Sequence, residues 1–567
     1  MHGPRMLECD LLVIGSGASG LAAAVTAAHY GLKVIVAEKA TQLGGTSAWS
    51  GGWLWIPRNA LAKAEGQQES AEEPDRYLRS QVHQDQLNEL QRTYLERGPE
   101  MVDFFQQHTA VRFYSGTRMP DMRDAPGAAL GGRSLCAQPY DGRALGDWIY
   151  KLRPPLDVIS LGGMGIAGGV DLGHFFNATT SLASMKHVTK RLARHIWDVL
   201  RYGRGQQLVN GNALVARLLR SALDLGVEFL TSAPAVQLIG TAKQISGAVL
   251  EIEGQRVEVL ARRGVVLACG GFPHNQARLA QLTAQTTPKQ PHYSAAPPEN
   301  TGDGLRLGEQ VGGQVADDLV HAVAWAPVSL VPRSNGQYRN FPHLIDRAKP
   351  GFLAVGADGQ RFTNEADCYH DFMNHLFAST PAGKPYAAWL ICDHKARNRY
   401  GIGWAKPFPF WACYYQYKGY LFRGKTLAEL AKACGIDAAG LEATVKRFNQ
   451  YAAQGEDPDF GRGRSAYNKA QGEVLHGPNP SLRPLQGPFY AVKLLPGSLG
   501  TFAGLKTDAQ ARVLNTEGQA IPGLFAVGND MNTAFGGYYP SGGITLGPGM
   551  TFGYLAGRTL AGHQYGG

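Results

Sequence analysis

The sequence Asp10-Leu-Leu-Val-Ile-Gly-Ser-Gly-Ala-Ser-Gly20 decides the fold of this chain. The apolar run Asp10–Ile14 predicts a short buried strand, and the small residues of Leu21–Tyr30 predict a helix. A second strand is expected over Lys33–Ala37, with the carboxylate of Glu38 at its end. Strand, glycine turn, helix and acid-terminated strand together predict a β-α-β unit that binds a dinucleotide.

Each glycine of this turn has a predicted role. Gly15 permits the tight turn, Gly17 lets the backbone approach a pyrophosphate, and Gly20 lets the helix pack against the strand. The N–H groups at the start of the helix are oriented to bind phosphate oxygens. Glu38 is expected to accept hydrogen bonds from ribose hydroxyl groups.

Further small residues favour FAD over NAD as the dinucleotide. Gly44-Gly-Thr-Ser47 and Ser50-Gly-Gly52 extend the glycine-rich site along the chain. A nicotinamide needs no such extension, whereas a ribityl chain and a tricyclic ring do. Gly523–Asp530 is a second strand-to-loop glycine element, from which Asn529 or Asp530 can reach the ribityl hydroxyl groups.

Composition limits the class of protein. The 567 residues are 44% hydrophobic and 18% charged, which indicates a folded protein of two or three domains. The net charge of +9 comes without a block of Lys or Arg and without a nucleic-acid-binding motif. The seven scattered cysteines contain no C-x-x-C pair, so we expect free thiols and no metal site. Without a predicted signal peptide or membrane span, a cytoplasmic location is expected.

Further strands and helices that can extend the predicted β-α-β unit follow along the chain. The patterns predict a helix over Asn212–Leu225, strands at Val227–Leu230, Ala235–Ile239, Gly247–Ile252, Gly264–Ala268 and Gly523–Val527, and a last helix over Thr545–Leu560. Between residues 290 and 485 aromatic residues and prolines increase and the β-α alternation stops. We therefore assign residues 1–288 and 486–567 to a discontinuous FAD-binding domain, and residues 289–485 to a catalytic domain.

A basic amphipathic helix is predicted over Met185–Tyr202. Lys and Arg alternate there with Val, Leu and Ile. A solvated surface helix is the simpler interpretation, and a peripheral contact with a membrane is the open alternative.

Near the end of the chain, the segment Gly536–Tyr554 places Tyr538, Tyr539 and Ser541 in a glycine-rich turn before a helix. The order of this segment after Gly15–Gly20 and Asn300-Thr-Gly-Asp-Gly304 resembles the fumarate reductase/3-ketosteroid dehydrogenase flavoprotein superfamily over nearly the whole chain. The resemblance implies non-covalent FAD and an α/β fold. That fold has a Rossmann-like FAD-binding domain of the GR2 type and an inserted α+β catalytic (cap) domain, with the active site between them.

These considerations give a predicted set of cofactor-binding residues. The set comprises Gly15, Ser16, Gly17, Ala18, Ser19, Gly20, Glu38, Lys39, Gly44, Gly45, Thr46, Ser47, Gly51, Gly52, Val236, Cys269, Gly270, Gly528, Asn529, Gly543, Ile544 and Thr545.

The chemistry expected over the flavin follows from the residues of the C-terminal segment. Carboxylate reductases of the superfamily use a catalytic arginine with histidine and arginine clamps, and residues 531–543 carry neither. This argues for a neutral substrate that bears a ketone. Desaturation next to a ketone requires polarisation of its oxygen, a base for the α-proton, and hydride transfer to flavin N5.

The resemblance also implies roles for individual residues. Tyr539 and the N–H of Gly543 match the Tyr-Pro-x-x-Gly motif that holds the ketone oxygen. Tyr369, which follows Arg361-Phe-Thr-Asn-Glu365, matches a second family tyrosine. His370 and Asp371 are expected to be solvated or to cap a helix.

Two departures from the pattern of the 3-ketosteroid 1-dehydrogenases in this superfamily favour another position for the new double bond. Met122 stands where the 1-dehydrogenases carry a tyrosine, and Ser541 stands where they carry glycine. Tyr-Pro-Ser is the pattern of the 3-oxo-5α-steroid 4-dehydrogenases, in which the serine takes the C4 proton. The favoured function is therefore 4,5-dehydrogenation of a 5α-3-ketosteroid, with relay of the proton through Tyr369.

Other functions stay open. They are a 3-ketosteroid 1-dehydrogenase, a flavin-dependent enone or enoate reductase on a non-steroid substrate, and a flavin-binding subunit that passes electrons onward. The expected partners are a small hydrophobic ketone or steroid and an electron acceptor of unspecified chemistry. A nucleic-acid partner is not expected.

Overall fold

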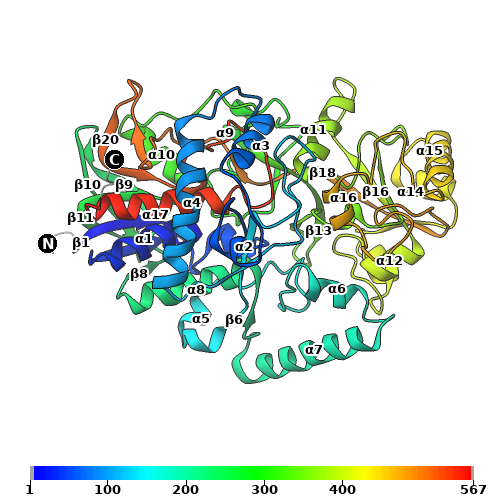
Figure 1. Ribbon diagram of the computed structural model, residues 1–567, viewed down its shortest axis with the longest axis horizontal. Coiled ribbons are helices and arrows are strands. Elements are labelled where there is room, and N and C mark those ends of the chain that lie inside the picture. Colours follow the sequence, from blue (N-terminus) through cyan, green and yellow to red (C-terminus); the bar gives the residue numbers. More distant parts are fainter. Residues whose placement is uncertain (1–4, 564–567) are drawn as a thin grey trace.

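A computed structural model of the chain describes residues 5–563, whose strands form two large sheets and two small ones (Figure 1). The first large sheet has eight strands in the described range. Its main path runs β19 (Arg512–Leu514), β20 (Ala520–Ala526), β11 (Gln255–Leu267), β1 (Arg5–Ile14), β2 (Val34–Glu38) and β8 (Glu228–Thr231), with β10 (Gln244–Ile252) and β9 (Ala235–Thr241) paired onto β11.

This sheet confirms the predicted Rossmann-like unit. β1 pairs in parallel with both β2 and β11, and helix α1 (Ala18–His29) crosses between β1 and β2. The strand predicted over Gly264–Ala268 is longer than expected, because β11 begins at Gln255 and pairs first with β10. β20 pairs in parallel with β11, so the C-terminal segment returns to the sheet that the N-terminus begins.

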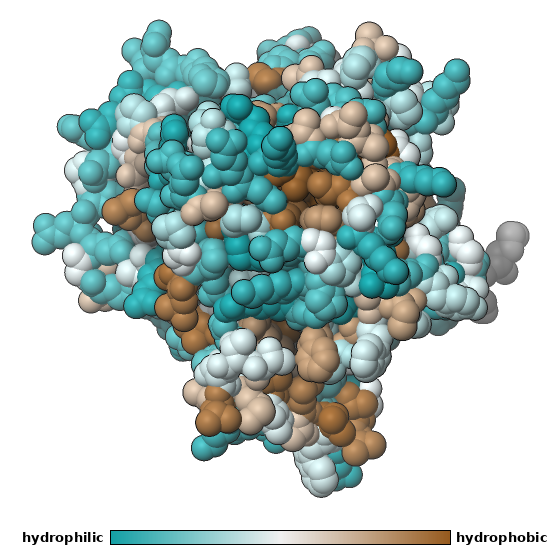
Figure 2. Space-filling view, turned by 90° about the vertical axis from the view of Figure 1, so that its right-hand side faces the viewer, coloured by the Kyte–Doolittle hydropathy of each residue, from teal (hydrophilic) through white to brown (hydrophobic). Residues whose placement is uncertain are grey.

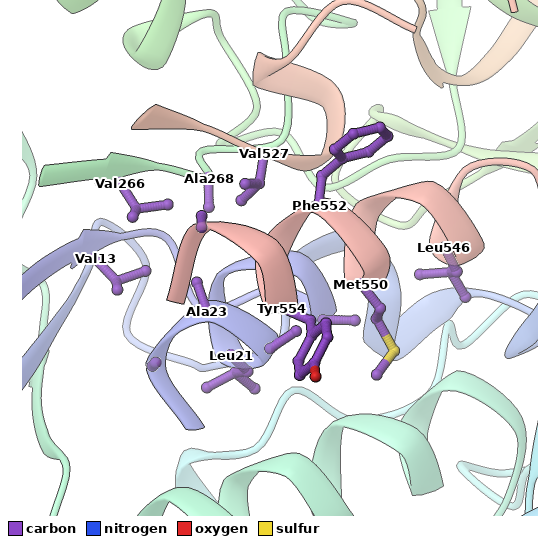
Figure 3. Packing of buried hydrophobic residues seen from close by; sticks show 14 of the residues in the cluster. Val13, Leu21, Ala23, Val266, Ala268, Val527, Leu546, Met550, Phe552 and Tyr554 are labelled. Carbon is purple, nitrogen blue, oxygen red and sulfur yellow. The ribbon is translucent and has the colours of Figure 1, made fainter. Parts of the chain in front are cut away.

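Helix α17 (Leu546–Leu560) packs along α1 in the core of this unit (Figures 1 and 3). The two helices approach closely because small residues line their contact. A Cβ at Gly553 would lie 2.4 Å from the Ser19 carbonyl oxygen, and one at Gly557 would lie 2.7 Å from that of Ala23. In Figure 3, Tyr554 of α17 lies near Leu21 of α1, and Met550 lies on the other side of Tyr554; all three belong to the apolar core.

The second large sheet has seven strands in the described range. Its main path runs β14 (Tyr338–Pro342), β13 (Val323–Pro332), β18 (Phe489–Thr501), β16 (Ala388–Asp393) and β15 (Phe352–Val355), and β12 (Tyr293–Ser294) and β17 (Phe422–Gly424) also pair with β18. The predicted return to the first domain at residue 486 lies just before β18, whose hydrogen bonds belong to this second sheet. The domain boundaries themselves stay a prediction.

Short strands and helices surround the two sheets. The small sheets contain β3 (Trp53–Trp55), β5 (Ser134–Ala137) and β4 (Phe113–Ser115), and β6 (Tyr140–Asp141) with β7 (Gln207–Leu208). The helices not yet named are α2 (Ala60–Ala64), α3 (Glu72–Val82), α4 (Glu89–His108), α5 (Trp148–Lys151), α6 (Val170–Phe176), α7 (Leu182–Tyr202), α8 (Asn210–Asp224), α9 (Gln276–Leu282), α10 (Asp303–Gln310), α11 (Tyr369–Ser379), α12 (His394–Tyr400), α13 (Ala412–Tyr417), α14 (Leu427–Cys434), α15 (Ala438–Ala452) and α16 (Ala466–Gln471).

Candidate active site

A cavity of about 1710 Å³ lies between the glycine turn after β1 and residues near the second large sheet. Pockets for one small ligand usually measure about 300–1,000 Å³, so this cavity has room for a dinucleotide and a substrate together. Its wall includes Gly15 and Glu38 on one side and Tyr369 and Tyr539 on the other. The structure therefore brings the predicted nucleotide site and the predicted phenols to one space.

Most predicted cofactor residues line this cavity. Those that do are Gly15, Ser16, Gly17, Ser19, Glu38, Lys39, Gly45, Thr46, Ser47, Gly51, Gly52, Cys269, Gly270, Gly528, Asn529, Gly543 and Thr545, whereas Ala18, Gly20, Gly44, Val236 and Ile544 do not. Gly20 instead supports the turn from behind, because a Cβ there would lie 2.3 Å from the Gly15 carbonyl oxygen. Gly44 likewise braces the site, with its N–H donating to Ser16 Oγ at 2.9 Å.

The nucleotide half of the cavity fits FAD on its own geometry. Gly17 is the N-cap of helix α1 and provides no side-chain cap. The Ala18 N–H donates to Ser47 Oγ at 3.0 Å, and the N–H groups that follow in the first turn are oriented to bind phosphate oxygens. Glu38 accepts hydrogen bonds from the N–H groups of Ser16 and Ala40, at 3.1 and 2.9 Å. These bonds fix the carboxylate at the cavity wall, where it can also accept from a ribose.

Two side chains connect the parts of the site: Asn300, which the predicted set of cofactor residues lacks, and Asp530, which the sequence predicted as a partner of the ribityl hydroxyl groups but which does not line the cavity. Asn300 donates from Nδ2 to Thr46 Oγ1 and to the Gly270 carbonyl, both at 3.0 Å. Asp530 accepts from the N–H groups of Cys269 and Gly271, at 2.5 and 3.0 Å. Burial raises the pKa of Asp530 to about 6. The signal for Asn300 was its glycine motif, but only the fold shows which loop it holds.

The predicted tyrosines Tyr369 and Tyr539 meet at the cavity wall. Their hydroxyl groups form a direct hydrogen bond, and their ring centroids lie 5.1 Å apart. Tyr369 is the first residue of α11, and Tyr539 comes from the C-terminal segment, 170 residues later. Burial raises the pKa of both phenols, and for Tyr369 the neighbouring Tyr539 adds to the shift. Both rings are therefore neutral hydrogen-bond donors at neutral pH.

Gly543 lies on the same cavity wall, next to the start of α17. Its φ of +103° is accessible to glycine, and a Cβ there would lie 2.7 Å from the Trp55 backbone nitrogen. The Trp55 N–H donates to the Gly543 carbonyl at 3.3 Å, which fixes the direction of this peptide. The N-terminus of α17 faces the cavity through Thr545 and Leu546, where its dipole favours negative charge.

Ser541 does not line the cavity. The residue is 1% exposed, and its hydroxyl donates to Asp121 Oδ1 at 3.2 Å. Asp121 is itself buried and also accepts from Trp55 Nε1 and from Arg133 Nη1, at 2.7 and 2.6 Å. A buried carboxylate requires donors, so it holds the Ser541 hydroxyl away from the substrate space. The pairing spans 420 residues, and no local pattern could reveal it.

The sequence predicted that His370 and Asp371 are solvated or cap a helix; both lie in the first turn of α11, where His370 is buried and Asp371 is half-buried. The His370 side chain is buried, and its Nδ1 accepts from the Trp325 N–H at 3.2 Å. Asp371 accepts two hydrogen bonds from Arg123, at 2.9 and 2.5 Å. Arg123 also donates to the Tyr539 carbonyl at 2.8 Å. This ion pair therefore fixes the backbone that carries the Tyr539 phenol.

Met122 lies at the cavity wall, as its expected place in the substrate loop implies. Its methyl group would be 3.3 Å from a Cβ at Gly542, so it covers the turn between Ser541 and Gly543. Tyr114 also lines the cavity, on the strand β4.

Comparison with known proteins gives consistent family evidence. The FAD binding domain family matches residues 10–546. A 4-oxocyclohex-2-ene-1-carboxylate 5-dehydrogenase of Sinomonas cyclohexanicum is 40% identical over 559 residues, covering 98% of this chain and 94% of that protein.

Two solved structures give the structural comparison. The 3-ketosteroid Δ1-dehydrogenase of Sterolibacterium denitrificans, in complex with 1,4-androstadiene-3,17-dione, has a TM-score of 0.89 at 34% identity, and the match covers 98% of this chain and 100% of that chain. The 3-ketosteroid Δ4-(5α)-dehydrogenase of Rhodococcus jostii has a TM-score of 0.62 at 22% identity, covering 99% of this chain and 100% of that chain. The second likeness shows the fold alone.

Proposed function

Since the chain belongs to the 3-ketosteroid dehydrogenase family of FAD-dependent oxidoreductases acting on CH–CH groups, we propose that it desaturates the bond α,β to the ketone of a six-membered ring. The observation that carries this proposal is the pair of buried phenols, Tyr369 and Tyr539, on the cavity wall beside Gly543. The pair offers a neutral hydrogen-bond donor to a ketone oxygen and a second oxygen next to it.

In the proposed reaction, the Tyr539 hydroxyl and the Gly543 N–H hold the ketone oxygen and stabilise the enolate that develops there. Tyr369 takes the proton from the α-carbon as a tyrosinate, which is only a minor species at neutral pH because burial raises the pKa of this phenol. FAD held by the Gly15–Gly20 turn would supply the acceptor for the hydride that leaves the β-carbon. Two donors aimed at one oxygen lower the barrier to loss of a proton from carbon, which is otherwise too weak an acid.

We place the proton acceptor at Tyr369 rather than at Ser541. The Ser541 hydroxyl is occupied by Asp121 and does not line the cavity. The main reason for favouring 4,5-dehydrogenation was that Ser541 would face the substrate. Without that serine, formation of the double bond on the other side of the ketone, as in 1-dehydrogenation, is better supported.

Replacement of Ser541 by alanine tests this assignment. We expect kcat to stay within about threefold of wild type, because a positioned general base contributes about 10²–10⁴-fold and this hydroxyl does not reach the substrate. Steady-state kinetics with an artificial electron acceptor measure the effect. A loss of a hundredfold or more, with FAD still bound, would return the proton-acceptor role to Ser541.

The proposed substrate is a 3-ketosteroid or a ketone of similar size and polarity. The size of the cavity supports this choice, as do its apolar lining residues Leu156, Ile166, Phe175, Phe176 and Phe341. A hydrophobic wall with few polar groups is typical of sites for apolar ligands.

A second candidate is a 4-oxocyclohexane- or 4-oxocyclohexenecarboxylate. The relative at 40% identity supports it, and so do cationic groups that the C-terminal segment does not reveal. Lys349 and Lys406 line the cavity and donate to backbone carbonyl groups, with Lys349 Nζ 2.7 Å from the Gln471 oxygen and Lys406 Nζ 2.8 Å from that of Val158. Burial lowers the pKa of each to about 8, so both still carry charge at neutral pH.

A substrate panel distinguishes these candidates. The FAD-loaded enzyme is mixed anaerobically with a 4-ene-3-ketosteroid, a 5α-3-ketosteroid or 4-oxocyclohexanecarboxylate, and loss of flavin absorbance is followed together with product mass. We expect bleaching by both steroids and loss of two hydrogens at the 1,2 bond. Bleaching by the oxo acid alone would establish the second candidate. A flavin that no ring ketone bleaches would exclude the proposed activity.

A further inference from the structure

Helix α7 carries its side chains in an order opposite to that of an ordinary surface helix. Its buried residues are Ser184, Arg191 and Asp198, all polar. Most of its large apolar side chains face solvent: Leu182 is 81% exposed and Leu200 is 79% exposed. A surface helix of a soluble domain normally buries its apolar stripe and exposes its polar one.

The exposed apolar residues share one face of α7, in two groups near its ends with Thr189 and Ala193 between them. Leu182, Met185, Ile196 and Leu200 recur at helical spacing along one face of α7, with Trp197 beside them. The polar contacts hold the helix in this orientation: Arg191 pairs with Asp171 at 2.6 Å, and Asp198 accepts from the Gln206 N–H at 3.1 Å. The apolar face is therefore turned outward by specific interactions on the opposite face.

Basic residues flank this apolar face. Lys186, Lys190, Arg194 and Arg201 are exposed, and Asp198, the acidic residue of α7, is buried. The chain as a whole has a net charge of +9. An exposed apolar face with a cationic border matches an anionic lipid surface, in which apolar side chains insert below the headgroups and Lys or Arg contact phosphate.

The position of α7 in the molecule agrees with this partner. The helix forms an outer edge of the protein (Figure 1), and apolar side chains gather at the same lower end in the space-filling view (Figure 2). Five other apolar residues are both exposed and part of the cavity lining, so they lie at the mouth of the cavity. They are Ile159, Val170, Phe408, Phe410 and Val474. Val188 and Leu192 of α7 also line the cavity, so the helix is part of the cavity wall.

We infer that the α7 face, defined as Leu182, Met185, Ile196, Trp197 and Leu200 with their flanking basic residues, docks the protein on the surface of an anionic membrane. Within residues 5–563 no helix is both long and apolar enough to cross a bilayer, so the helix lies in the plane of the interface. Docking brings the apolar mouth of the cavity to the lipid, from which an apolar molecule can enter without crossing water.

Co-sedimentation of the full FAD-loaded chain with vesicles tests the inference. We expect binding to vesicles of phosphatidylcholine with phosphatidylglycerol, weaker binding to phosphatidylcholine alone, and a decrease at high salt. The double variant Leu182→Glu/Leu200→Glu should lower the partition coefficient by about tenfold or more, since charges replace two leucine side chains that insert into the lipid interface. Lys186→Glu should lower it by about fivefold or more and only on anionic vesicles.

The matched control is Leu130→Glu, which places the same charge on another 78%-exposed leucine outside α7. It should bind vesicles as the wild type does. Flavin absorbance and turnover confirm that each variant is folded. Equal binding of wild type and the double variant, or no binding of wild type to anionic vesicles at low salt, overturns the inference. So does a wild-type dimer in analytical ultracentrifugation that the double variant converts to monomer, because the face would then be a self-interface.

Discussion

Tyr539→Phe is expected to lower kcat by about 10²–10³-fold while FAD remains bound, because the variant removes one of two donors to the developing oxyanion. The substitution keeps the ring, which is buried and packs at 5.1 Å from Tyr369 and 5.6 Å from the His370 ring, so the loss is confined to the hydroxyl group. Stopped-flow measurement of flavin reduction reports the chemical step directly. The visible spectrum of the purified variant checks that the cofactor is retained.

Tyr538→Phe is the matched control, since it removes the hydroxyl group of the neighbouring tyrosine and keeps its ring. The Tyr538 ring packs edge-to-face against His83, with ring centroids 5.3 Å apart, and does not line the cavity. We expect a kcat close to that of wild type. If both variants turn over normally, the proposed contact with the ketone oxygen is wrong, whereas equal loss in both would indicate a general disturbance of the segment.

Glu365→Gln is expected to destabilise the protein by about 3–5 kcal/mol, the cost of breaking a buried ion pair by removing one partner. Glu365 is fully buried and accepts from Arg361 at 2.7 and 2.8 Å and from Arg462 at 3.1 Å. It also accepts from the Ala354 N–H of β15 at 3.0 Å. A glutamine leaves two buried guanidinium groups with less compensating charge. Thermal unfolding at saturating FAD, followed by circular dichroism, measures the loss.

The pH dependence of this effect has a definite sign. Burial raises the pKa of Glu365, but the Arg361 and Arg462 guanidinium groups outweigh it and hold the pKa at about 2. An unfolded glutamate has a pKa of about 4.3, so the stabilisation is present above about pH 4.3 and is lost as the pH falls towards 2. The difference between wild type and Glu365→Gln should therefore be largest near neutral pH and shrink in acid.

Glu309→Gln serves as the control for this substitution. Glu309 pairs with Arg278 at the surface, with its side chain 40% exposed. Solvent screens such a pair, and we expect a change below about 1 kcal/mol. A destabilisation by Glu365→Gln no larger than that of Glu309→Gln would show that the buried cluster contributes little.

Local sequence patterns were sufficient for the nucleotide half of the molecule. The order strand, glycine turn, helix, strand, Glu38 is a chain of short-range signals, and β1, α1 and β2 follow it closely. The helix after Gly543 was likewise recognisable, because Pro548 and the preceding glycine-rich turn mark a helix start. The first half of β11 was missed, since its pairing with β10 is a long-range hydrogen-bonding choice.

For the candidate site too, the sequence and the tertiary structure supplied different information. The sequence by itself was sufficient to predict two phenols for the site, because Tyr369 and Tyr539 each match a motif of the family that the chain resembles. Only the tertiary structure decided that their hydroxyl groups touch, and that Ser541 faces Asp121 instead of the substrate. These two hydrogen bonds join residues that are 170 and 420 positions apart in the sequence. They depend on how the two sheets and the C-terminal segment pack together, and no periodic sequence pattern encodes that packing.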